Sequence, residues 1–113
     1  MELEVYTTLS LFNLRTAMRF CVAEKHEVAV TLYQKGLDFC NILRQKNLRA
    51  NEVEKLQANE FELISNLSIS LHKLDKQKES LEYAEKAKEL CKELPFKVYQ
   101  TLSFLALFLN FLH

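Results

Sequence analysis

The near absence of glycine and proline limits this chain more than any other feature of its sequence. Its 113 residues include one glycine, Gly36, and one proline, Pro95. β-Hairpins, glycine-rich phosphate loops and nucleophile elbows all need such residues at defined turn positions. The sequence therefore predicts an all-α fold, and its length predicts a single domain over residues 1–113.

Apolar residues recur at intervals of three and four, the periodicity of amphipathic helices that pack in pairs. This spacing predicts about five helices, over residues 2–24, 27–46, 51–74, 78–93 and 96–113. Asn51, with Glu54 three residues later, is expected to cap the third helix, and Pro95 to end the fourth. The stripes expected in the core include Leu9, Phe12, Ala17 and Phe20, then Ala29, Tyr33, Gly36, Cys40 and Leu43, then Leu56, Ile64, Leu67 and Leu71, then Leu81, Ala84, Ala87, Leu90 and Cys91.

Charge and cysteine content narrow the classes of function. Fifteen Lys and Arg residues balance fifteen Asp and Glu residues, so no net basic field favours nucleic acid or an anionic membrane. The three cysteines have no CxxC spacing, and the N-terminus lacks the layout of a signal peptide, which predicts a cytoplasmic protein. No histidine or cysteine arrangement suits a metal, and no catalytic constellation can be assembled. We therefore expect no metal, no cofactor and no enzymatic activity in this chain.

The sequence contains an internal repeat with an offset of 51 residues. The offset places small residues on small ones and large residues on large ones: Ala17 on Ser68, Phe20 on Leu71, Ala29 on Ser80, Leu32 on Tyr83, Lys35 on Lys86 and Gly36 on Ala87. Small residues at such positions allow two antiparallel helices to approach closely, while the large residues fill the groove between them.

The second copy of this pattern, from Asn66 to Leu90, resembles a tetratricopeptide repeat (TPR), and the segment from Ala17 to Leu37 resembles another. The family has a period of about 34 residues and stacks helix-turn-helix units into an α-solenoid. The resemblance implies a first repeat over about 10–43, a second over about 52–93 and a partial third helix over about 96–113. The offset of 51 residues in this chain is longer than the family period. The extra residues lie within 38–60, where they are expected to lengthen the second and third helices. Elongated helices there resemble the TPR domains of immunophilin-type (FK506-binding or cyclophilin-like) co-chaperones, and the chain could then be a truncated fragment of such a protein.

The resemblance implies an adaptor that binds a partner peptide on the concave face lined by the first helix of each pair. In the chaperone-binding subset, a carboxylate clamp of Lys, Asn and Arg residues holds the partner's C-terminal carboxylate. Here Asn66 matches the third-helix Asn and Lys97 the fifth-helix Lys, whereas the remaining clamp positions fall on Leu14, Met18 and Thr101. Arg15 and Arg19 lie one position beyond the missing pair and could form a displaced cationic site. The predicted peptide-binding face consists of Arg15, Arg19, Ser65, Asn66, Ile69, Lys73 and Lys97, and the predicted partner is a protein or peptide, with a heat-shock chaperone tail as one candidate.

Residues 101–113, TLSFLALFLNFLH, are almost entirely apolar. This segment is shorter than the roughly 20 residues that cross a membrane, so a partial third repeat is the favoured interpretation. Its exposed surface would then promote self-association through residues 102–112. The alternative function is accordingly a structural or oligomerisation module that uses this helix and has no peptide-binding clamp.

Overall fold

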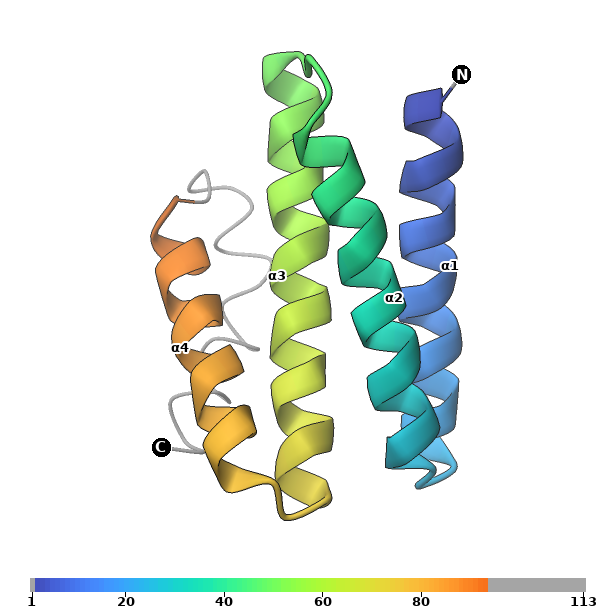
Figure 1. The fold of residues 1–113 in the computed structure, drawn as a ribbon, viewed down its shortest axis with the longest axis vertical. Helices are drawn as coiled ribbons and strands as arrows, with labels where there is room; N and C mark the ends of the chain where they lie inside the picture. Colours follow the sequence, from blue (N-terminus) through green and yellow to red (C-terminus); the bar gives the residue numbers. More distant parts are fainter. Residues whose placement is uncertain (1, 94–113) are drawn as a thin grey trace.

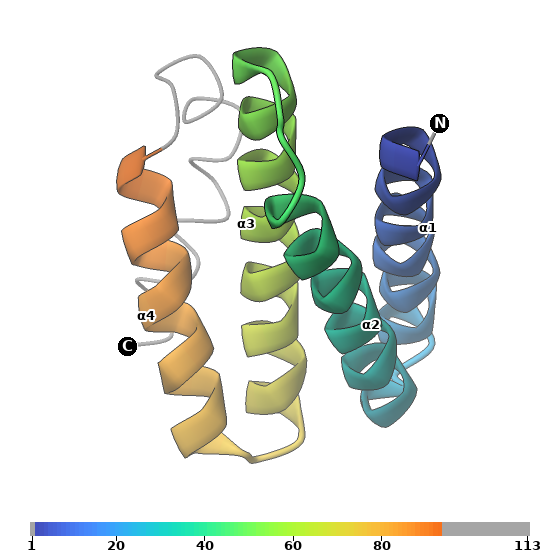
Figure 2. The same ribbon diagram turned by 45° about the horizontal axis from the view of Figure 1, so that its top comes forward.

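The computed structural model describes residues 2–93 and shows four helices there, α1 (Glu2–Val22), α2 (His26–Arg44), α3 (Ala50–Lys73) and α4 (Gln77–Glu93). Successive helices run antiparallel, and α1 and α4 stand at opposite ends of the row (Figure 1). The second helix packs against both α1 and α3, and these two also touch each other. Figure 2 shows α2 crossing obliquely between α1 and α3, while α4 packs beside α3.

The described residues confirm the all-α prediction. Each helix boundary lies within a few residues of its predicted place, and the surplus over 38–60 is taken up by helix, because only residues 45–49 separate α2 from α3. The expected cap at Asn51 is wrong. The third helix begins at Ala50, and the Glu52 carboxylate accepts a hydrogen bond of 2.8 Å from the backbone N–H of Arg49. The stop at Pro95 and the fifth helix over 96–113 lie outside the described residues.

The helices form two hairpins, α1–α2 and α3–α4. The turns of these hairpins have the same geometry and lie 51 residues apart in the sequence. Glu24 and Asp75 both adopt the left-handed backbone conformation, with φ of 60° and 62°. In each turn the following backbone N–H bonds to a carbonyl five residues earlier, Lys25 to Phe20 at 2.8 Å and Lys76 to Leu71 at 2.9 Å. These bonds are those of a Schellman C-cap, which satisfies carbonyls at the end of a helix. The internal repeat is therefore a repeat of structure as well as of sequence.

The small residues of the repeat lie where the helices of each hairpin meet. Ala17 and Ala29 are fully buried, and so is Ser68, while Ser80 is nearly so. In the second hairpin the two serine hydroxyls each donate to the other residue's backbone carbonyl, at 2.8 Å in both directions. Because alanine at the equivalent positions of the first hairpin permits the same turn, the small volume is the shared requirement and the hydrogen bonds are an addition.

Gly36 lies at a close approach of α2 to α3. A β-carbon at this position would lie 2.7 Å from Cδ2 of Leu63, closer than side chains pack. The backbone there also accepts a hydrogen bond from the Ser10 hydroxyl of α1, at 3.3 Å. The predicted role of Gly36 in close helix packing is confirmed, and it joins three helices.

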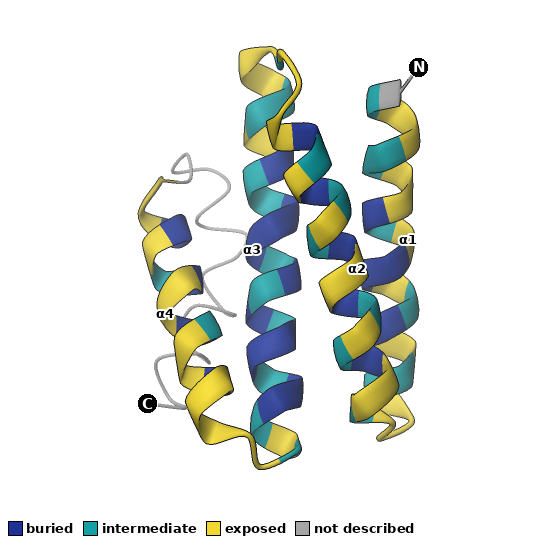
Figure 3. Ribbon diagram, viewed as in Figure 1, coloured by how far each residue is buried: buried dark blue, intermediate teal, exposed yellow. Residues whose placement is uncertain are grey.

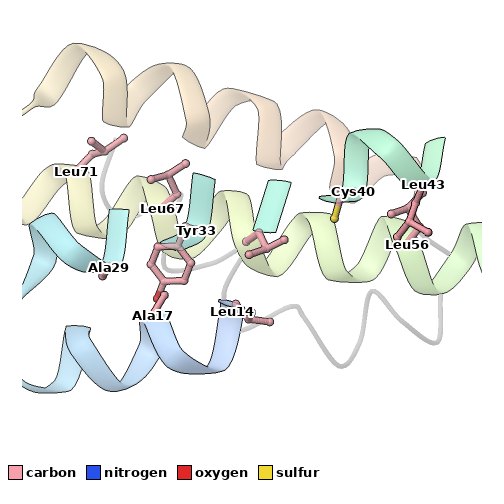
Figure 4. Close-up of a cluster of buried hydrophobic side chains, with 10 residues drawn as sticks. Leu14, Ala17, Ala29, Tyr33, Cys40, Leu43, Leu56, Leu67 and Leu71 are labelled. Atoms are coloured by element: carbon pink, nitrogen blue, oxygen red, sulfur yellow. The ribbon is translucent and has the colours of Figure 1, made fainter. Parts of the chain in front are cut away.

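The main core lies where α1, α2 and α3 meet (Figure 4). Tyr33 is completely buried there, and its hydroxyl bonds at 3.3 Å to the sulfur of Cys21, which lies 3.0 Å from the Ser70 hydroxyl. A smaller cluster joins α3 to α4 around Phe61. The third helix is therefore the most deeply buried of the four (Figure 3).

Three core predictions are wrong. Leu9, Phe12 and Leu81 are exposed, although each follows the helical period of its stripe. The period identifies an apolar face, but a face is buried only where another helix covers it. By contrast, Cys40 and Cys91 are buried among apolar side chains, as their helical spacing predicted.

Candidate functional site

One side of the molecule carries the same set of positions twice, once on α1 and once on α3. On α1 these positions hold Glu4, Thr8, Leu11, Arg15, Met18 and Val22, and on α3 they hold Lys55, Asn59, Glu62, Asn66, Ile69 and Lys73. Each residue of the second set follows its counterpart by 51, and spacings of three and four keep each set on one face of its helix. We call these residues the α1/α3 face.

A pocket of about 690 Å³ occupies the part of this face nearest the N-terminal ends of both helices. Leu3, Thr7, Thr8 and Leu11 of α1 form one wall, and Leu56, Asn59 and Glu62 of α3 form the other. The loop between α2 and α3 contributes Leu48 and Arg49. Direct hydrogen bonds join the two helices beside the pocket, between Asn59 and Ser10, and toward their other end, between Cys21 and Ser70.

Asn59, which lines the pocket, carries an unsatisfied buried acceptor. Its Nδ2 donates a 2.6 Å hydrogen bond to the Ser10 hydroxyl, but its buried Oδ1 has no hydrogen-bond partner among the described residues. A buried carbonyl oxygen without a partner costs about 1–3 kcal/mol. A hydrogen-bond donor that reached this oxygen would recover that free energy.

Glu62 places a half-buried carboxyl group on the same wall. Burial raises its pKa above the usual value, and the positive charge of Arg15 on α1 opposes this change. Glu4 and Glu52 also line the pocket, together with Arg49 and Lys55. The pocket is therefore rich in acceptors, whereas the other end of the face presents the exposed cations Arg15 and Lys73 around half-buried Ile69.

The structure brings some of the predicted site residues together and separates others. Arg15, Ile69 and Lys73 lie on the α1/α3 face with Asn66, and Arg19 is exposed one position to the side of it on α1. Ser65 does not belong to the face, because it is fully buried and its hydroxyl donates to the Phe61 carbonyl at 2.5 Å. Lys97 lies outside the described residues, as do Thr101 and the segment 102–112.

Two details bear on the proposed clamp. Leu14, which occupies a clamp position by resemblance, is a core residue at 3% exposure, so no cation at that position would be free to bind. Asn66 donates its Nδ2 to the Glu62 carbonyl one helical turn earlier, at 2.7 Å. One of its two amide N–H groups is thus engaged within α3, which leaves the second N–H and the amide oxygen for a ligand in this conformation.

The residues that sequence reasoning missed are Thr8, Leu11, Asn59 and Glu62. Extending the 51-residue offset toward the N-terminal ends of the helices would have found them, because they continue the stripe that contains Arg15 and Asn66. The unsatisfied oxygen of Asn59 had no signal in the sequence, because it arises from the packing of Ser10 against α3.

Within residues 2–93 no group of three or more histidine, cysteine, aspartate or glutamate side chains is arranged to hold a metal ion. None of the helices over the same residues has the length and apolar character needed to cross a membrane. Comparison of the chain with models of protein families, with curated proteins and with solved structures finds no match in any of the three.

Proposed function

We propose that this chain is a protein-protein interaction adaptor of the tetratricopeptide type, which binds a peptide segment of a partner on the α1/α3 face. The observation that carries this proposal is the repeated α1/α3 face with a pocket between its two helices. Two hairpins with the same turn present equivalent positions side by side, which is how a repeat protein builds an extended binding surface.

The chemistry of the face favours a segment with two kinds of group. An extended peptide offers backbone N–H donors, and the carboxylates of Glu4, Glu52 and Glu62 line the pocket as acceptors for them. Leu3, Leu11 and Leu56 line the same pocket and suit an apolar side chain. At the other end, Arg15 and Lys73 suit an acidic side chain or a terminal carboxylate.

A co-chaperone role is the narrower form of the proposal. It requires a terminal carboxylate to be held by the displaced cations Arg15 and Arg19, because the clamp position Leu14 is in the core. The alternative function, assembly through residues 102–112, concerns residues outside those described and stays a prediction.

The first test is a titration of the full chain with an acidic peptide of the chaperone-tail type that ends in a free carboxylate, alongside the same peptide with an amidated C-terminus. Arg15→Glu and Lys73→Glu should each weaken binding of the first peptide by about tenfold or more, since each removes a charge-assisted contact worth about 1.5–3 kcal/mol. Lys35→Glu is the matched control, because Lys35 is exposed on α2 away from the face.

The two peptides separate the broad proposal from the narrow one. Equal affinity for both, with the variants still effective, would support peptide binding and reject carboxylate recognition. If Lys35→Glu weakened binding as much as Lys73→Glu, the effect would come from net charge alone and the α1/α3 face would not be the site.

A further inference from the structure

A second surface of α1 is explained by comparison with the equivalent surface of α3. Leu56, Glu60 and Leu63 of α3 are 6%, 5% and 0% exposed. Their counterparts 51 residues earlier are Val5, Leu9 and Phe12, which are 54%, 36% and 65% exposed. Positions that are buried on α3 are therefore open to solvent on α1. We call Val5, Leu9 and Phe12 the outer strip.

The cover over the α3 positions is α2, which runs antiparallel to α3 and packs against it (Figure 1). Gly36 of α2 lies against Leu63, and Arg44 pairs with Glu60 through two hydrogen bonds. No helix stands on the corresponding side of α1 in the described part of the chain, because α1 is at the end of the row (Figures 1 and 2). The outer strip is thus a helix-packing face that the fold leaves uncovered.

The outer strip differs from its counterpart in one chemical respect. Leu9 replaces Glu60, so the strip has no carboxylate that needs an ion-pair partner. A fully apolar strip that ends on Phe12 is suited to apolar side-chain surface of another helix. A hydrophobic face of this kind is seldom left in water in a soluble monomer.

We propose that the outer strip is a dimer interface, in which α1 of a second copy of this chain packs antiparallel to α1. Phe12 is the middle residue of α1, which spans Glu2–Val22, so a twofold axis through Phe12 superposes α1 on itself, brings the two Phe12 side chains together and packs Val5 and Leu9 against the aliphatic parts of Arg19 and Arg15 of the second copy. Such a two-fold interface is the commonest form of homo-oligomer.

Charge favours the antiparallel arrangement over the parallel one. Glu4 lies near the N-terminal end of α1, and Arg15 and Arg19 lie toward its other end. In an antiparallel pair Arg19 comes beside Val5 and Glu4 of the second copy, and Arg15 comes beside its Leu9. A parallel pair would instead place like charges together. The aliphatic part of Arg15 could also cover Leu9 while its guanidinium stays in water.

Sedimentation equilibrium of the full chain measures the dimer dissociation constant. Phe12→Glu should raise that constant by about tenfold or more, because it places two like charges on the axis of an apolar interface. The fold should survive this change, since Phe12 is 65% exposed, and far-UV circular dichroism checks it. Leu81→Glu is the matched control, since Leu81 is an exposed apolar residue on α4, and it should leave the constant unchanged.

A charge exchange tests the orientation. Arg19→Glu alone should weaken the dimer, because it faces Glu4 of the second copy, and adding Glu4→Arg should restore it. A chain that stays monomeric at roughly millimolar concentration would overturn the proposal. So would a dimer that resists Phe12→Glu but is lost on Leu107→Glu, a result that assigns self-association to residues 102–112. Either result leaves peptide binding by the α1/α3 face unaffected.

Discussion

Replacing Gly36 by alanine tests the close approach of α2 to α3. The added methyl group would lie 2.7 Å from Cδ2 and 3.3 Å from Cδ1 of Leu63, and Leu63 is fully buried, so it has little space to move into. Overpacking of this kind costs about 1–3 kcal/mol, while the better helix propensity of alanine returns about 1 kcal/mol. We expect the free energy of unfolding to fall by about 1 kcal/mol.

The effect of Gly36→Ala on stability should change sign when Leu63 is also replaced. Leu63→Ala alone should cost about 2–5 kcal/mol, because it leaves a cavity. In that background Gly36→Ala meets no obstruction, so it should stabilise the chain by about 1 kcal/mol through helix propensity. The two substitutions should therefore show a favourable coupling of about 2 kcal/mol in a double-mutant cycle.

Urea denaturation followed by far-UV circular dichroism measures all four proteins of the cycle. Lys35→Gly and Lys35→Ala, at the exposed neighbouring position, calibrate the helix-propensity difference in the same helix. If Gly36→Ala stabilised the chain in the presence of Leu63, then α2 and α3 would not approach as closely as the structure shows, and the reasoning from the small-residue positions of the repeat would fail.

Four further substitutions or measurements follow from the structure. Glu24→Gly should stabilise the chain by about 0.5–1 kcal/mol, since glycine adopts the left-handed conformation at this C-cap without strain, and thermal unfolding measures the gain. Glu62→Gln should stabilise the chain at neutral pH, because burial raises the pKa of Glu62 in the folded state and so makes its ionised form unfavourable there. This gain in stability should shrink as the pH falls through the raised pKa, because the carboxyl group of the folded chain then takes up a proton. It should vanish below the pKa of about 4.3 that glutamate has in unfolded chains. Arg44→Ala should lower the free energy of unfolding by about 2 kcal/mol, because it leaves buried Glu60 without its cation. This value is at the lower end for buried ion pairs because Arg44 is half exposed and solvent screens its charge. The thiol of Cys40 should react with iodoacetamide at neutral pH only in denaturant, because burial raises its pKa to about 11, and mass spectrometry of the folded chain would contradict this if it found Cys40 alkylated.

The candidate site was only partly predictable. The shared face of Arg15, Asn66, Ile69 and Lys73 follows from helical spacing together with the 51-residue offset, and all four positions lie in helices. The prediction of Ser65 on that face is wrong: Ser65 is fully buried, and adjacent helical residues such as Ser65 and Asn66 point about 100° apart. Its burial depends on the packing of α3 against other helices, which no local pattern specifies.

The sequence by itself determined the features that depend on local chain physics. The scarcity of glycine and proline made the described chain helical, apolar periodicity placed the helices, and the 51-residue offset indicated two hairpins that prove to share one turn geometry, with Glu24 and Asp75 in equivalent places. These features are set by a residue and its near neighbours, so they can be read without knowledge of the fold.

Only the tertiary structure decided which apolar positions are buried and which polar groups find partners. Phe12 and Leu63 occupy the same position in the two copies of the repeat, yet one is exposed and the other is fully buried, because α2 covers α3 and nothing in the described chain covers the outer side of α1. In the same way, the packing of Ser10 against Asn59 leaves one amide oxygen without a partner at the pocket wall. Burial and hydrogen bonding are properties of pairs of segments that are distant in sequence. The amphipathic periodicity of one helix does not indicate which other helix packs against it.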